Sequence, residues 1–459
     1  MKSDIKNKLN TVLFGSFMFL QLVLLGLGNH AGEGLLSDER RELVYYVLQV
    51  LVIAGFLAYA VWEHHFGDAA RKYTGAAVTA VLTAGSPVLA IADKASPFYI
   101  TAAFAVMPFL GFLGGAVYHR MSLDTAAGVM TGRRMGIGCA AAVGLQYVLQ
   151  IGWGETPLLP VFLPAAVVLT AAALQQNEPE AVPLEKPDDT MPRSLLNACL
   201  TAAAFLIFTS FYNGYIHHLQ IQTGYTEYNV YSWPRLILIP CYLLFAVIGD
   251  KRRGRLVPVV ALCISLTALL NSVLTGSAGA YRLNMCLFYC AIAASVSYYD
   301  LTFWRLAQRT KHPALWASMG RLLDSGMVLV CAGCQISKLD APAVLTVNIV
   351  CLAVLILLMT LSGAFNLTDL TVQQLAPSLL SPESTLQLIR DQYSLTPRET
   401  DVLRELVLTE DKQTAISDRL SISVKMLQKH VTSIYKKTGA ETRSGLSELY
   451  HKTMIGQQQ

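Results

Sequence analysis

The feature that most constrains this chain is a series of long apolar runs. Between residues 10 and 364 there are twelve runs of about 18 to 23 residues that carry few charges. A helix of about 20 apolar residues is long enough to cross the hydrocarbon core of a bilayer. The spans are expected at 10–29, 43–62, 75–92, 98–118, 135–153, 157–174, 195–213, 232–248, 256–275, 283–299, 317–335 and 342–364. The sequence therefore predicts an all-α, polytopic membrane helix bundle that lies in a lipid bilayer.

The composition agrees with this interpretation. Only 14% of the residues are charged and 53% are hydrophobic, whereas soluble domains carry about 25% charged residues. All nine cysteines precede residue 352, in the apolar part, where cysteine usually packs as a small apolar residue. We expect no disulfide framework, no metal site and no other cofactor. The sequence contains no phosphate-binding glycine loop, metalloprotease helix or nucleophile elbow, so we do not expect an enzyme.

A polar stretch, residues 175–194, divides the twelve spans into two sets of six. It contains several acids and four prolines and predicts a solvated linker. The membrane domain is thus expected at 1–364, with halves at about 10–174 and 195–364.

The basic residues predict the orientation of the spans. If the N-terminus is cytoplasmic, the cytoplasmic ends and loops hold eighteen Lys and Arg and the outer side holds six. Such a bias is the usual mark of cytoplasmic loops. An even number of spans then places the C-terminus on the same side. We expect a multi-pass protein of a bacterial cell (inner) membrane with both termini in the cytoplasm.

The two sets of six resemble each other. Gly67-Asp68 and Gly249-Asp250 follow spans two and eight at an offset of 182 residues, and the latter pair is followed by a basic run through Arg255. Gly132-Arg133 and Gly320-Arg321 begin spans five and eleven at an offset of 188. Six plus six spans, a polar linker and a Gly-Asp-basic loop resemble the major facilitator superfamily. The resemblance implies a central cavity between the halves and does not by itself establish transport.

Polar residues within the spans are candidates for a ligand site, because polar groups inside a bilayer face protein or water. Arg235, at the outer end of span eight, is flanked by Tyr231 and Trp233. It is suited to an anionic ligand, with the alternative that it reaches the outer headgroups. The other candidates for the ligand site are Gln146, Gln150 and Asn213.

The residues after the last span have a different pattern. We expect a tether at 365–392 and a separate helical domain at 393–459. Thr396-Pro397-Arg398-Glu399 is typical of a helix start with a capping box. Further amphipathic helices are expected at about 412–420, 424–438 and 442–452, with Ser423 as N-cap of the third and Gly439 as its stop.

This segment resembles the LuxR-type (FixJ/NarL-like) helix-turn-helix domain. The matching residues are Leu395 to Glu399, Val402-Leu403, Ile416, Leu420, Ile422-Ser423, Lys425, His430, Ile434 to Lys437, Gly439 and Arg443. The resemblance implies that the helix at 424–438 reads double-stranded DNA and that the domain forms a homodimer. The expected DNA-contacting residues are Lys425, Gln428, Lys429, His430, Thr432, Lys436 and Lys437.

Together these features favour a membrane-embedded one-component transcriptional regulator, in which the spans sense an unidentified small-molecule signal and the C-terminal domain binds promoter DNA. The alternative is a secondary transporter with a fused regulatory DNA-binding tail, for which a buried acid would be the distinguishing feature. A third reading is a membrane scaffold whose tail binds another protein.

Overall fold

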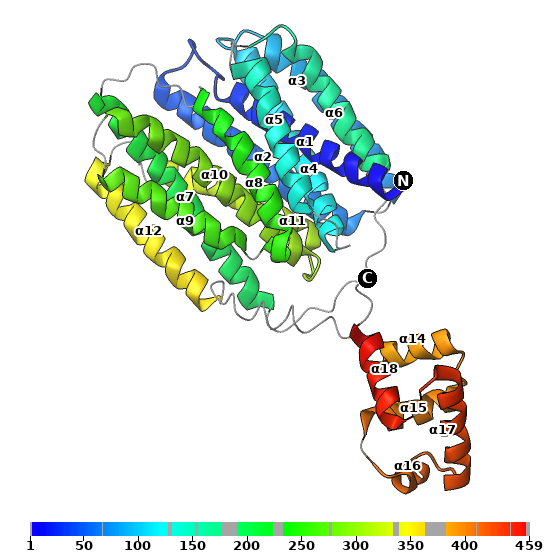
Figure 1. The fold of residues 1–459 in the computed structure, drawn as a ribbon. Helices are drawn as coiled ribbons and strands as arrows, with labels where there is room; N and C mark the ends of the chain where they lie inside the picture. The colour runs from blue at the N-terminus through cyan, green and yellow to red at the C-terminus, as the bar shows by residue number, and fades with distance from the viewer. Residues whose placement is uncertain are drawn as a thin grey trace. The chain divides into compact units, whose positions relative to one another are not determined.

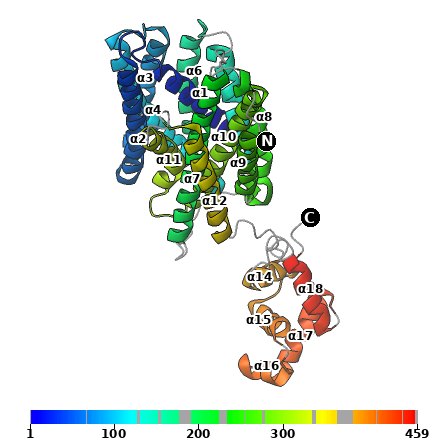
Figure 2. The same ribbon diagram turned by 90° about the vertical axis from the view of Figure 1, so that its left-hand side faces the viewer.

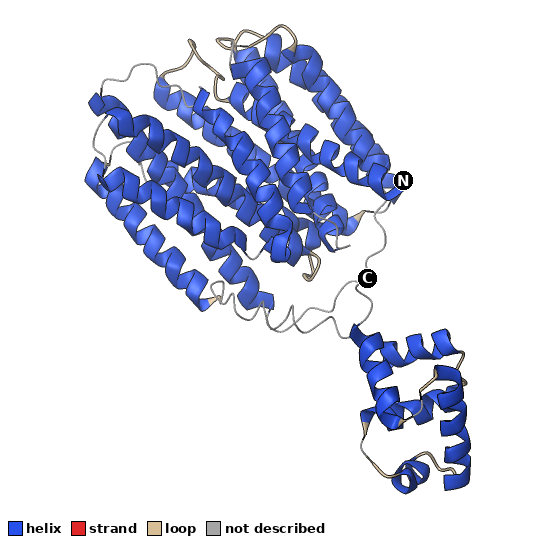
Figure 3. Cartoon of the chain, in the orientation of Figure 1, coloured by secondary structure: helices blue, strands red, loops and turns tan. Residues whose placement is uncertain are grey.

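The structure is a computed structural model. It describes residues 2–66, 68–126, 131–151, 155–176, 191–223, 233–254, 256–274, 278–333, 339–362, 382–409, 411–440 and 442–455. The chain forms two compact units, Met1–Phe365 and Asn366–Gln459. In the described parts both consist of helices and turns (Figure 3). Most of the predicted linker at 175–194, and Tyr231 beside the predicted ligand site, lie outside the described residues.

The first unit contains the apolar helices (Figure 1). They are α1 (Lys2–Gly28), α2 (Asp38–His65), α3 (Asp68–Ile91), α4 (Pro97–Ala126), α5 (Thr131–Gln146), α6 (Leu159–Gln176), α7 (Met191–Thr223), α8 (Leu238–Asp250), α9 (Leu256–Leu274), α10 (Ala278–Ala307), α11 (Pro313–Gly333) and α12 (Ala341–Leu361). A π-helical segment, Tyr147–Ile151, continues α5, and a 3₁₀ segment, Trp233–Ile237, leads into α8.

The membrane character of this unit is confirmed, with fewer full-length spans than predicted. Within the described residues ten helices are long and apolar enough to cross a bilayer, against twelve predicted. The two remaining apolar segments are α5, which has only 16 residues before its π-helical segment, and α6, a shorter apolar helix. The sequence had predicted both segments as full-length spans.

The helices pack as two sets that meet along one interface. Within the first set α1 packs on α4, α5 and α6, and α2 packs on α4. Within the second set α7 packs on α10 and α12, and α10 packs on α9 and α11. Between the sets α5 lies against α8, and α2 and α4 lie against α11 (Figures 1 and 2). The interface therefore joins residues that are far apart in sequence.

Glycines allow close helix contacts at two of these interfaces. A Cβ atom at Gly136 of α5 would lie 2.3 Å from the Tyr242 carbonyl oxygen of α8. A Cβ at Gly55 of α2 would lie 2.1 Å from the Pro108 carbonyl oxygen of α4. Small residues of this kind let membrane helices approach each other closely.

The Gly249-Asp250 pair, which ends α8, connects the two sets at one end of the bundle. Asp250 accepts hydrogen bonds from the backbone N–H groups of Gly132 (2.8 Å) and Arg133 (2.9 Å), in the first turn of α5. Arg305 of α10 donates to the Gly249 carbonyl oxygen (3.0 Å). A carboxylate at a helix N-terminus satisfies free N–H groups and complements the helix dipole. We call this end, where α2, α4, α8 and α10 finish, the basic end.

The second unit has its own apolar core and contains α14 (Pro382–Tyr393), α15 (Pro397–Leu408), α16 (Gln413–Arg419), α17 (Val424–Thr438) and α18 (Arg443–Ile455). The helices expected from the sequence are present. In addition α14 places Leu386 and Ile389 in this core, so the described residues of the predicted tether, from Pro382 onward, belong to this unit.

Local signals set the ends of α15 and α17. Thr396 and Glu399 form the predicted capping box. Ser423 caps α17 by accepting from the Met426 N–H, and Gly439 ends that helix with φ of +75°, a conformation that glycine adopts without strain.

Candidate functional site between the two helix sets

The interface between the two sets contains two groups of polar side chains. One, which we call the amide–arginine chain, consists of Gln146, Gln150 and Arg235. The other, which we call the charged cluster, consists of Tyr118, Asp300, Arg321 and Asp324.

The amide–arginine chain crosses the interface. Arg235, in the 3₁₀ segment before α8, donates to the Gln146 side-chain oxygen of α5 (2.9 Å). The Gln146 amide donates to Gln150 (2.9 Å) and to the Leu22 carbonyl oxygen of α1 (3.0 Å). Gln150 in turn donates to the Val23 carbonyl oxygen (3.4 Å). A guanidinium group and two amides, which offer both donors and acceptors, therefore lie together beside the backbone of α1.

The local backbone explains this arrangement. Gln146 ends the regular part of α5, and Gln150 lies in the π-helical segment Tyr147–Ile151. A π-helical turn widens the helix and often occurs at functional sites. Pro234 is buried in the 3₁₀ segment that carries Arg235. Three of the predicted ligand residues thus meet.

The other predicted ligand residues are placed differently. Trp233 begins the 3₁₀ segment and is 53% exposed. Asn213, on α7, is also exposed, and no described contact joins it to the amide–arginine chain. Tyr231 is not among the described residues.

The charged cluster lies closer to the basic end. Arg321 of α11 donates through Nε to the Tyr118 hydroxyl of α4 (2.6 Å) and lies 3.3 Å from Asp324 Oδ2 and 3.6 Å from Asp300 Oδ2. The Tyr118 hydroxyl donates to Asp300 Oδ2 of α10 (3.3 Å). The guanidinium carbon also lies 5.9 Å from the centre of the Tyr118 ring and 5.5 Å from that of Tyr299, within cation–π range. The cluster therefore holds α4 of the first set to α10 and α11 of the second.

The charges of this cluster do not balance. One guanidinium group faces two carboxylates, those of Asp300 and Asp324. Asp300 is completely buried, and its Oδ1 has no hydrogen-bond partner among the described residues. A surplus negative charge in a low-dielectric interior is costly, and a bound proton or monovalent cation neutralises it.

Sequence reasoning assigned no site role to this cluster. Arg321 was identified only as part of the repeated Gly-Arg pair that begins span eleven. Tyr118 and Arg321 are 203 positions apart. The available signal was the presence of two acids and an arginine within or close to spans ten and eleven, which is rare in membrane helices without a function.

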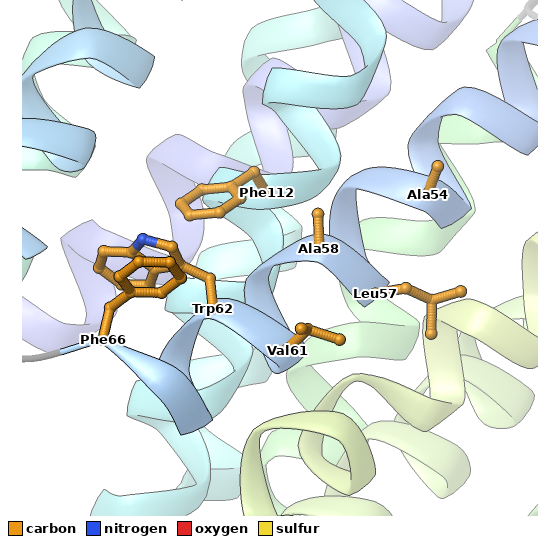
Figure 4. Close-up of a pocket in the computed structure, with 7 residues that line it drawn as sticks. All are labelled: Ala54, Leu57, Ala58, Val61, Trp62, Phe66 and Phe112. Carbon is orange, nitrogen blue, oxygen red and sulfur yellow. The ribbon is translucent and has the colours of Figure 1, made fainter. Parts of the chain in front are cut away.

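The surface pockets of this unit are less suited to a polar solute. One pocket between α2 and α4 is lined by Ala54, Leu57, Ala58, Val61, Trp62, Phe66 and Phe112 (Figure 4). All seven side chains are apolar or aromatic, and Val61 and Phe66 are 61% and 52% exposed. This composition fits contact with acyl chains better than recognition of a polar solute.

In the second unit the predicted DNA-contacting residues lie on α17 and are partly engaged within the unit. Lys437 binds Glu399 (2.8 Å) and the Ser394 carbonyl oxygen (3.1 Å), and Gln428 donates to Gln413 (3.4 Å). Of the remaining residues, His430 is half-buried, and Lys425, Lys429, Thr432 and Lys436 are exposed.

Glu399 is the centre of a hydrogen-bonded group in this unit. Besides Lys437, it accepts from the Ser433 hydroxyl (2.6 Å) and the Thr396 N–H (2.7 Å). Burial alone would raise the pKa of Glu399, but these hydrogen bonds outweigh it and lower the pKa from 4.5 to about 2. The carboxylate is thus ionised at neutral pH and contributes to the stability of the unit.

Comparisons with known proteins place the fold of the first unit. No family model matches the chain, and no curated protein matches it. Among solved structures, it is similar to the human organic anion transporter TETRAN, with 14% identity, a TM-score of 0.53, and coverage of 76% of this chain and 98% of that one. A variant of the Escherichia coli fucose:proton symporter FucP matches at 13% identity and a TM-score of 0.53, over 78% of this chain and 98% of that one.

A further structure of FucP, described as a major facilitator superfamily transporter in the outward conformation, matches at 13% identity and a TM-score of 0.50, over 77% of this chain and 98% of that one. Identities this low show the fold alone. The first unit therefore has the fold of major facilitator superfamily transporters, and the chain is a multi-pass membrane protein with this fold.

These comparisons overturn the main functional prediction. The identification of the chain as a LuxR-type transcriptional regulator was wrong, since no family model of that type matches and the similar solved structures are transporters. They likewise give no support for double-stranded DNA as a partner or for a homodimer through the C-terminal domain. The physical reason for the error is that an amphipathic helix with a basic face specifies a helical packing and does not specify its partner.

Proposed function

We propose that the protein is a secondary transporter that moves a small polar solute across a membrane by alternating access between its two helix sets. The observation that carries this proposal is the charged cluster at the interface of a transporter-like fold. Buried ionisable residues in membrane helices are costly, and they mark solute pathways and proton relays. A buried acid was also the feature expected to distinguish a transporter from a sensor.

The amide–arginine chain is the proposed solute site. Gln146 and Gln150 offer donors and acceptors to hydroxyl or carbonyl groups, and Arg235 offers a positive charge to an anionic or strongly accepting group. Because Arg235 comes from the second set and the glutamines from the first, a solute bound there contacts both sets. The solute therefore binds the conformational states of the transporter with different affinities, and this difference is what allows a ligand to drive a conformational change.

The charged cluster is the proposed coupling site. Loss or gain of one cation at Asp300 changes the net charge around Arg321, and with it the attraction between α4 and the helices α10 and α11. When the sets move apart at the basic end, these contacts and the Asp250 contacts to α5 are lost together. The solute gradient and the cation gradient are then linked through one interface.

We also propose that the basic end faces the cytoplasm of a bacterial cell and that the protein lies in the inner membrane. The support is the eighteen-to-six distribution of basic residues. The chain termini then both lie in the cytoplasm. A C-terminal fusion to a reporter enzyme that is active only outside the cytoplasm is expected to stay inactive, and an active fusion would refute this orientation.

Uptake by proteoliposomes tests the solute site. The purified full chain is reconstituted and assayed with a panel of labelled carboxylates, sugars and nucleosides. For the solute that is taken up, Gln146→Ala and Arg235→Ala are expected to raise KM at least tenfold, whereas the exposed Asn213→Ala is the matched control and leaves KM unchanged. Equal effects of all three variants would contradict the proposed site.

A further inference from the structure

Two cysteine side chains in the second helix set lie unusually close together. Cys241, on α8, and Cys290, on α10, have their sulfur atoms 3.2 Å apart. Both side chains are half-buried where these two helices pack. Cys286 lies one turn before Cys290 on α10 and is also half-buried.

This geometry is close to that of a covalent bond. The sulfur atoms of a disulfide are about 2.05 Å apart. The two thiols therefore need to approach by only about 1 Å to form this bond. The pair is in contact and unbonded, which is the arrangement that reversible oxidation requires.

We propose that Cys241 and Cys290 form a redox-sensitive thiol pair, which a two-electron oxidant of the peroxide class converts into a disulfide. One thiolate attacks a peroxide oxygen, the O–O bond breaks, and a sulfenic acid and one water form. The second thiol then attacks the sulfenic sulfur, the S–S bond forms, and a second water leaves. Hydrogen peroxide is reduced to two waters, and the two thiols are oxidised by two electrons.

The position of the pair connects it with the proposed transport path. Cys241 follows Arg235 by six positions, and Cys290 precedes Asp300 by ten on the same helix. A disulfide would fix the spacing between the helix that follows the amide–arginine chain and the helix that carries the buried acid. Oxidation is expected to slow transport at least fivefold, an effect that rests on the proposed function.

The chemical part is tested without any transport assay. The purified full chain is treated with hydrogen peroxide, its remaining thiols are alkylated with iodoacetamide under denaturing conditions, and the alkyl groups are counted by intact mass. The chain has nine cysteines. We expect nine alkyl groups before oxidation, seven after it, and nine again after dithiothreitol.

Serine variants identify the pair. Neither Cys241→Ser nor Cys290→Ser can form the disulfide. After peroxide the variant that lacks the attacking thiol keeps all eight alkylatable thiols, and the variant that retains it loses one, as a sulfenic acid. Cys263→Ser, which changes an exposed cysteine of α9, is the matched control and falls from eight to six. Loss of two thiols from Cys241→Ser, or retention of all nine in the unaltered chain, would overturn the proposal.

The transport arm separates this inference from the proposed function. If peroxide slows uptake in the unaltered protein and not in Cys241→Ser, both stand. If the disulfide forms and uptake is unchanged, its regulatory effect is refuted while the thiol pair stands. If no variant transports any solute but the mass result is as expected, the proposed function fails and the thiol pair remains.

Discussion

Replacing Arg321 by glutamine is the most informative perturbation of the charged cluster. In the folded protein this side chain faces Asp300 and Asp324 at 3.6 and 3.3 Å. Its removal leaves the fully buried carboxylate of Asp300 and the partly exposed carboxylate of Asp324 without a counter-charge. Removing one partner of a buried ion pair costs about 3–5 kcal/mol of unfolding free energy.

Asp300→Asn has the opposite electrostatic consequence. It leaves Arg321 paired with Asp324 alone, so that one positive charge faces one negative charge. The unfolding free energy is then expected to fall by only about 1 kcal/mol, because the substitution weakens the hydrogen bond from Tyr118 and leaves no charge unpaired. The expected order is therefore that Arg321→Gln destabilises the protein about 2–4 kcal/mol more than Asp300→Asn. The double variant should cost less than the sum of the single ones, because the groups interact directly.

Reversible SDS unfolding of the purified protein, followed by tryptophan fluorescence, measures this order. Trp304 is fully buried with its ring centre 5.6 Å from that of Tyr118, so its emission reports on the cluster. Arg40→Gln, which changes an exposed arginine in the first turn of α2, is the control and should change the unfolding free energy by less than about 0.5 kcal/mol. If Asp300→Asn lowers the unfolding free energy as much as Arg321→Gln does, the cluster does not hold a surplus negative charge.

Three further predictions concern other parts of the chain. Because the pKa of Glu399 is lowered from 4.5 to about 2, the stabilisation it provides is present above pH 4.5 and is lost as the pH falls towards 2. Urea unfolding of the second unit should show a fall of about 1–2 kcal/mol in unfolding free energy over this range, after allowance for solvent screening. This fall should be absent in Glu399→Gln. Gly136→Ala, which places a Cβ against α8, should lower unfolding free energy by about 1–3 kcal/mol, whereas Gly326→Ala, which meets no atom within 4 Å, should not. Deleting residues 366–459 should leave uptake by proteoliposomes unchanged, since the two units have separate cores.

Local sequence signals predicted local structure well. The Thr396 and Glu399 capping box, the Ser423 cap and the Gly439 stop depend on residues within four positions of one another, so they can be identified from the sequence. The apolar runs likewise predicted the helices of the membrane unit, because length and hydropathy are properties of one segment. The short α5 was misjudged, since the π-helical segment Tyr147–Ile151 that follows it has no clear sequence signature.

The contacts between helices were only partly predictable. Gln146, Gln150 and Arg235 were expected as site residues because each is polar within an apolar span. Their mutual hydrogen bonds depend on how α5 packs against α8, which segment patterns do not specify. The pairing of Arg321 with Tyr118 was missed for the same reason. The function of the second unit was mispredicted because its helical pattern constrains its fold and leaves its partner open.

The most direct test of the proposed function is whether a cation gradient drives solute uptake through Asp300. Proteoliposomes that contain the purified chain are given, in separate arms, a pH gradient or a sodium gradient, and accumulation of the transported solute is followed with and without an ionophore. The proposal predicts accumulation above equilibrium in one arm, its collapse with the ionophore, and equilibration without accumulation in Asp300→Asn, while the exposed Asp93→Asn behaves as the unaltered chain. The absence of uptake of any solute, or equal accumulation by Asp300→Asn, would contradict it.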